Sequence, residues 1–151
     1  MRDPEVVRFL EARFAEQTQE SIGNFIEKAN ASRHTWLVGI FVDGGHVGNV
    51  KLAVDPHHNR ADIGILIGEK KYWGQGIARR AIALICDYAF SELGIFKLNA
   101  GCYETNLASR KTFEAAGFEI ECVRASQFVD QDKRVAGLYL TRFRPGAERP
   151  A

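Results

Sequence analysis

The chain has 151 residues, of which 46% are hydrophobic and 26% are charged, so it is long enough for one core and too apolar to be disordered. Its formal net charge of +1 gives no support for binding nucleic acid through bulk electrostatics. We find neither a signal-peptide pattern nor the ~20 apolar residues of a membrane span, and therefore expect a cytoplasmic protein that binds no membrane.

Two helices are predicted at the N-terminus. Asp3 is a suitable N-cap and Pro4 a suitable first residue for a helix through Phe14, and a second helix follows Thr18. The apolar residues recur at helical spacing, with Val6, Val7, Leu10 and Phe14 in the first helix and Ile22, Phe25 and Ile26 on the inner face of the second.

The remainder alternates strands and helices. A hairpin is expected around Asp43-Gly44-Gly45, and a helix that begins near Asn106 is expected to end at Gly117. The predicted strands are 36–42, 46–54, 61–68, 97–103, 118–129 and 134–143, and a further amphipathic helix covers 76–93. This order predicts a single α+β domain over residues 1–144 and a frayed tail over 145–151.

The segment KKYWGQGIARRA, residues 70–81, joins a predicted strand to a predicted helix. Glycine there lets the backbone approach a ligand closely, and the free amides of a helix start favour an anion such as phosphate. A dinucleotide fingerprint would need glycine where Arg79 stands, and the Gly-Lys-Ser/Thr of a P-loop is absent. Two glycines alone would favour a turn that merely relieves strain.

Three segments in order, IGILIG, YWGQGIARRAI and KLNAGCYETNLASRKTFEAAGF, resemble the GNAT superfamily of acyl-CoA-dependent N-acetyltransferases. The closest resemblance is to the Rim-type branch of ribosomal-protein alanine acetyltransferases and to its relatives that acetylate amino sugars. It implies the GNAT-like fold, in which helices flank a central, mostly antiparallel mixed sheet, and acetyl-CoA as co-substrate. We expect no metal, since no cluster of ligand-type residues is evident.

The resemblance also assigns residues to the cofactor. The backbone of Ile65, Leu66 and Ile67 would pair with the pantetheine arm, and Asn106 and Ser109 would lie along it. The pyrophosphate would be held by the loop Trp73, Gly74, Gln75, Gly76, Ile77 and Ala78, in which Trp73 replaces the Arg or Gln of the family pattern. Lys70, Lys71, Arg79 and Arg80 either add positive charge there or are ordinary solvated side chains.

Catalysis is less well defined by the sequence. A backbone N–H near Leu66 or Ile67 could stabilise the oxyanion. Many family members carry a tyrosine as the acid where this chain has Phe113, so Ser109, with Tyr103 behind it, is the substitute. The candidate bases are Asp62 and Glu69, followed by Glu104, His57 and His58; purely structural or solvated roles for all of these residues stay open.

The predicted activity is direct acetyl transfer to the primary amine of an amino sugar, a peptide N-terminus or a small molecule. The alternative is a non-catalytic domain that binds acyl-CoA or a partner, motivated by Phe113. We also expect the sheet to lack the strand with which family members open. That would leave the hairpin 36–54 with an uncovered edge, either paired in a homodimer or exposed by truncation.

Overall fold

The computed structural model describes residues 3–148. Its helices are α1 (Pro4–Val7), α2 (Gln19–Ala31), α3 (Ile77–Ser91) and α4 (Leu107–Ala115). Its strands are β1 (Thr35–Val42), β2 (Gly45–Asp55), β3 (Arg60–Ile67), β4 (Lys97–Tyr103), β5 (Glu119–Asp130) and β6 (Lys133–Phe143). Two short 3-10 segments, η1 (Glu11–Phe14) and η2 (Lys70–Tyr72), complete the fold. The predicted tail lies partly outside the described residues.

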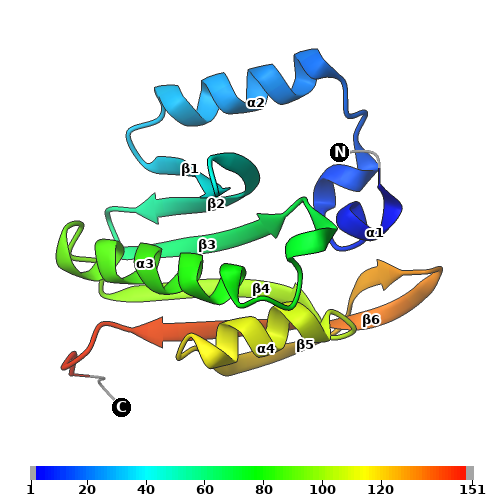
Figure 1. Cartoon of the computed structure of the whole chain (residues 1–151). Helices are drawn as coiled ribbons and strands as arrows, with labels where there is room; N and C mark the ends of the chain where they lie inside the picture. The colour runs from blue at the N-terminus through cyan, green and yellow to red at the C-terminus, as the bar shows by residue number, and fades with distance from the viewer. Residues whose placement is uncertain (1–2, 149–151) are drawn as a thin grey trace.

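The six strands form one sheet in the order β1-β2-β3-β4-β6-β5. Only β3 and β4 run parallel, and every other neighbouring pair is antiparallel. Figure 1 shows α3 and α4 in front of this sheet and α2 above β1. A mixed, mostly antiparallel sheet flanked by helices agrees with the expected α+β architecture.

The core lies between the sheet and α3. Ile82, Ile85 and Cys86 repeat at helical spacing and are buried against the sheet, where Leu52 and Leu98 are fully buried. Burying each such side chain contributes about 1.5–3 kcal/mol. The buried face of α3 thus runs through Ile82, Ile85, Cys86, Ala89 and Phe90, whereas its apolar Leu84 and Tyr88 are exposed.

The predicted first helix is wrong beyond Val7. The N-cap at Asp3 is present, since its carboxylate accepts from the Glu5 amide at 3.0 Å, but α1 ends after four residues and η1 follows at Glu11. The intervening Arg8 bends away to bind Asp130, 122 positions later. Tertiary contacts thus override a favourable local pattern.

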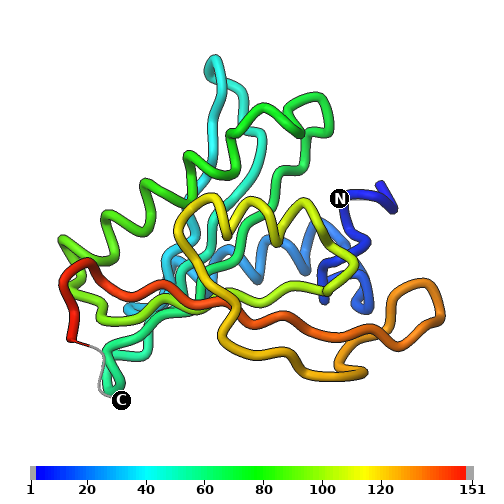
Figure 2. Tube along the Cα trace, turned by 90° about the horizontal axis from the view of Figure 1, so that it is seen from below, coloured from blue at the N-terminus to red at the C-terminus, as the bar shows by residue number. Residues whose placement is uncertain are grey.

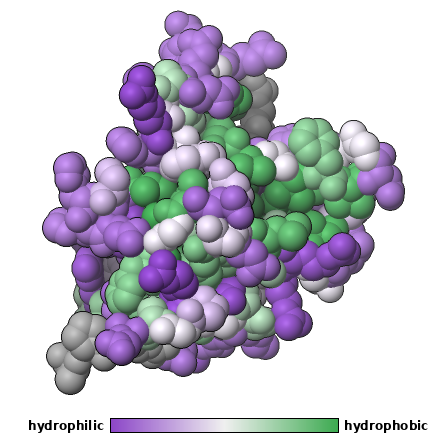
Figure 3. Space-filling view, turned by 90° about the vertical axis from the view of Figure 1, so that its left-hand side faces the viewer, coloured by the Kyte–Doolittle hydropathy of each residue, from purple (hydrophilic) through white to green (hydrophobic). Residues whose placement is uncertain are grey.

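The two edges of the sheet are β1 and β5. Within residues 3–148, β1 pairs with β2 alone, as expected for an uncovered edge, and Val38 and Phe41 are exposed along it. Figure 3 shows hydrophobic residues gathered across the middle of the side at which α3 and β6 end. The predicted homodimer stays a prediction.

Candidate active site

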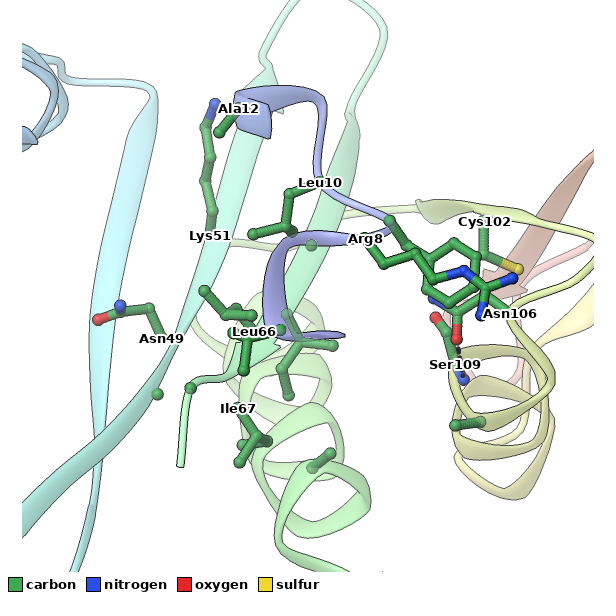
Figure 4. A pocket seen from close by; sticks show the side chains of 18 of the residues that line it. Arg8, Leu10, Ala12, Asn49, Lys51, Leu66, Ile67, Cys102, Asn106 and Ser109 are labelled. Carbon is green, nitrogen blue, oxygen red and sulfur yellow. Dashed lines mark hydrogen bonds between the residues drawn. The ribbon is translucent and has the colours of Figure 1, made fainter. Parts of the chain in front are cut away.

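The central feature is the separation of β3 from β4. The two strands pair through only three residue pairs, from Arg60–Lys97 to Asp62–Asn99, and then run apart to Ile67 and Tyr103. A cleft of about 1770 Å³ opens between them, above the ~300–1,000 Å³ typical of a site for one small ligand. Figure 4 looks into this cleft, where Leu66 and Ile67 of β3 face Cys102 of β4 and Asn106 and Ser109 beyond it. It has room for a large cofactor and a second substrate.

The glycine loop forms one end of the cleft. Gly74 and Gly76 adopt φ of +73° and +74°, which side chains rarely tolerate, and Gly76 is the N-cap of α3. A Cβ built on either glycine would meet no atom within 4 Å, so open space lies above both. The first backbone bond of α3 runs from the Arg80 amide to Gly76, which leaves the amides before Arg80 free for an anion.

Five of the six predicted loop residues line the cleft, namely Trp73, Gly74, Gly76, Ile77 and Ala78. Gln75 instead donates its side-chain amide to the Lys71 carbonyl at 2.6 Å. The indole N–H of Trp73 donates to the Ile67 carbonyl at 2.9 Å, which ties the loop to the end of β3. The Lys70 ammonium forms ion pairs with Asp3 and Glu5, so its charge is already compensated and adds little to an anion site.

The opposite wall is built by β4 and the start of α4. Asn106 caps α4, since its Oδ1 accepts from the Ser109 amide at 3.1 Å, and both residues line the cleft. Burial raises the pKa of the Cys102 thiol, and a hydrogen bond from Ser109 partly opposes this.

The candidate bases separate in space. Glu69 lines the cleft just beyond the end of β3. Asp62 is exposed, outside the cleft, and lies 3.5 Å from the Arg60 guanidinium. His57 and His58 donate backbone amides to the Asp55 carboxylate. The structure therefore brings Glu69 and Ser109 to one cleft and leaves Asp62 outside it.

Tyr103 has a partner that the sequence did not reveal. Its hydroxyl donates to the Glu11 carboxylate at 2.7 Å, and its ring stacks on Phe128. Burial, followed by the hydrogen bond and the charge of Glu11, raises the pKa of Tyr103 to about 12. Glu11 belongs to η1, in the segment mispredicted as helix, and no motif signals its role.

A second unpredicted contact fixes the N-terminal segment. Arg8 donates two hydrogen bonds to the carboxylate of Asp130, at 3.0 and 2.9 Å, and Thr105 donates a third at 2.7 Å. Figures 1 and 2 both place the tip of the β5–β6 hairpin on the side of α1. The guanidinium of Arg8 and then the Thr105 hydroxyl lower the pKa of Asp130, which is nearly fully buried.

A family model described as acetyltransferase (GNAT) domain matches residues 1–119. The chain belongs to the GNAT acetyltransferase family. The probable N-acetyltransferase YjcK of Bacillus subtilis is 42% identical over 53 residues, 35% of this chain and 29% of that protein. The spermidine N(1)-acetyltransferase of Escherichia coli K12 is 35% identical over 80 residues, 52% of this chain and 42% of that protein. The chain thus spans less than half of these curated relatives.

Solved structures share the fold of this GNAT chain. A spermidine N-acetyltransferase from Vibrio cholerae, in complex with CoA and spermine, has a TM-score of 0.82 at 18% identity and covers 94% of this chain and 84% of its own. A GNAT-family acetyltransferase from Bacillus anthracis has a TM-score of 0.79 at 20% identity, with coverage of 94% and 83%. The expected GNAT fold is confirmed, and the closer resemblance to the Rim-type branch stays a prediction.

Within residues 3–148, no helix is both long and apolar enough to cross a membrane. No group of three or more His, Cys, Asp or Glu side chains among these residues is arranged to hold a metal ion.

Proposed function

We propose that this chain binds acetyl-CoA between β3 and β4 and transfers the acetyl group directly to a primary amine. The observation that carries the proposal is the separation of β3 from β4 beside a loop with two left-handed glycines. An open strand edge suits an extended arm that carries amides, and the space above Gly74 and Gly76 suits phosphates. Acetyl-CoA, when bound, supplies the activated acetyl group.

Most of the proposed contacts to acetyl-CoA are made by backbone groups. The edge of β3 at Ile65–Ile67 pairs with the arm of the cofactor, and an amide near Leu66 or Ile67 stabilises the oxyanion. Free amides from Gly74 to Ala78 hold the pyrophosphate, while the Trp73 amide already donates to the Lys70 carbonyl. Asn106 and Ser109 contact the arm from the other wall.

Among the candidate bases, Glu69 is favoured over Asp62 because it lines the cleft. We propose that Glu69 takes the amine proton, directly or through a water. A thiol leaving group has a pKa of ~8.5, so an acid helps only modestly, and Ser109 is the proposed donor. Tyr103 is less suitable because its proton is already donated to Glu11.

The acceptor is proposed as a small primary amine. Two relatives are named for spermidine, so a polyamine joins the amino sugars and peptide N-termini that the Rim-type resemblance suggests. We further propose that the chain acts in the cytoplasm and assembles as a homodimer.

The cofactor site is tested with Gly76→Asp. A residue with a side chain adopts the left-handed conformation of Gly76 only at a cost of about 1–2 kcal/mol, and the new carboxylate repels phosphate. Calorimetry should therefore show at least tenfold weaker acetyl-CoA binding. Gly94→Asp is the matched control, since Gly94 has φ +63° and equal free space but lies outside the cleft. Undiminished affinity in the Gly76 variant would overturn the assignment.

Activity is measured as free-thiol release from acetyl-CoA with a panel of amines. Release with at least one amine is expected. Tight acetyl-CoA binding without release by any amine would instead favour the non-catalytic acyl-CoA-binding domain.

A further inference from the structure

The floor of the cleft beneath α2 is formed by β2 and β3. Asn49 lies opposite Leu66, and Lys51 lies opposite Gly64. Directly opposed residues in antiparallel strands project to the same face, so these four positions share one surface. All four line the cleft, beneath α2.

Lys51 is an uncompensated charge on this floor. Among residues 3–148 it forms no ion pair, and its ammonium lies 5.5 Å from the centre of the Phe25 ring. In Figure 4 its side chain extends from β2 toward Ala12. Leu10, Leu37 and Phe25 line the same space. Lys51 is exposed, so an anion that enters the cleft can reach its ammonium.

The other charges of the cleft leave Lys51 unpaired. Asp3 and Glu5 pair with Lys70, and Glu11 accepts from Tyr103. The remaining carboxylates that line the cleft, Glu16 and Glu69, are exposed and within 4 Å of no described cation. The positive charge of Lys51 is therefore available to a ligand.

Gly64 leaves a recess beside Lys51. A Cβ added there would meet no atom within 4 Å, and its backbone does not require glycine. Glycine inside a strand weakens it and often marks the close approach of a ligand. The absence of a side chain at this position thus makes room next to an unpaired ammonium.

We infer that the acceptor carries an anionic group, a carboxylate or a phosphate, which Lys51 binds above Gly64. The inference rests on the proposed acetyl transfer and narrows its substrate class. Gly64 precedes Leu66, the proposed oxyanion level, by two residues, or about 7 Å along the strand. In a small substrate whose anionic group lies about that far from its amine, the anion can bind Lys51 while the amine reaches the level of Leu66. Lys51 would instead repel a polycation.

The test compares matched amines in the thiol-release assay: glucosamine against glucosamine 6-phosphate, alanine against alaninamide, and spermidine. The unchanged protein should prefer at least one anionic member, and the two pairs distinguish phosphate from carboxylate. Lys51→Met should lower kcat/KM for that substrate roughly tenfold or more, the loss of one charged hydrogen bond, with the KM for acetyl-CoA unchanged. Lys51→Glu should shift the preference toward spermidine.

Two further variants isolate the effect. Lys28→Met is the control, because Lys28 is exposed on α2 outside the cleft. Gly64→Val fills the recess with a residue that suits a strand and should raise the KM for the anionic amine alone. Equal rates for the amines with and without an anionic group, or no effect of Lys51→Met, would overturn the inference. The proposed acetyltransferase activity would be unaffected by that result. Absence of release with every amine would overturn both.

Discussion

Trp73 ties the glycine loop to the end of β3. Its indole N–H satisfies the Ile67 carbonyl at the end of β3, where β4 has already moved away. A carbonyl without a partner there would be free to turn toward another donor. Trp73 therefore positions the strand end that the cofactor arm would meet.

Replacing Trp73 by Phe keeps an aromatic ring and removes the donor. The loss of one neutral hydrogen bond, about 0.5–1.5 kcal/mol, should weaken acetyl-CoA binding several-fold in calorimetry. Trp36→Phe is the control, because Trp36 packs against the core from β1. If both variants bind as tightly as the unchanged protein, Trp73 has no positioning role.

At the scale of elements, the contact between β2 and β3 depends on Gly48. A Cβ built on Gly48 would lie 2.2 Å from the Leu66 carbonyl oxygen and 3.0 Å from the Ile67 Cα. These atoms belong to backbone, so they cannot rotate away as a flexible side chain would. The close approach therefore fixes where the end of β3 lies relative to the cleft.

Gly48→Ala should consequently destabilise the protein by about 1–3 kcal/mol, the cost of overpacking, and reduce acetyl-CoA affinity by displacing β3. Denaturant unfolding measures the first effect and calorimetry the second. Gly64→Ala, three pairs along the same ladder, has free space and should change stability far less. Similar losses in both variants would contradict this account.

Periodicity and turn residues were sufficient to predict most elements. The strand 97–103 has the predicted bounds, and the helix after Gly76 and the hairpin at Asp43-Gly44 are present. The segment 3–14 was mispredicted because its conformation depends on Arg8 and distant Asp130. For the site, local motifs indicated the loop and Asn106, but no local pattern could place Glu11 against Tyr103 or leave Asp62 outside the cleft.

At the scale of the whole molecule, Asp130 joins three distant segments. Its carboxylate accepts hydrogen bonds from Arg8 of the N-terminal segment and from Thr105 of the β4–α4 connection. Asp130 itself is the last residue of β5. The pKa of Asp130 is lowered from its ordinary 3.8 by Arg8 and then by Thr105. Its ionised form therefore stabilises the folded state.

Asp130 makes the stability of the protein depend on pH. A carboxylate with a lowered pKa contributes stability above its unfolded pKa of 3.8 and loses it as pH falls through the folded value. Asp130→Asn should lower the free energy of unfolding at neutral pH and flatten its decline below about pH 4. Asp132→Asn, at the hairpin turn, is the control, because asparagine tolerates the positive φ there. An unchanged acid transition in Asp130→Asn would refute this role.

Because only three residue pairs join β3 to β4, the sheet consists of two halves. On one side lie β1, β2 and β3, and on the other β4, β6 and β5, connected by a short ladder at one end and by the segment that contains α3. An extended ligand between them would add the rungs that this ladder lacks. The donor substrate would then act as a temporary inner strand, making two half-sheets into one before the reaction and separating them again when the product leaves.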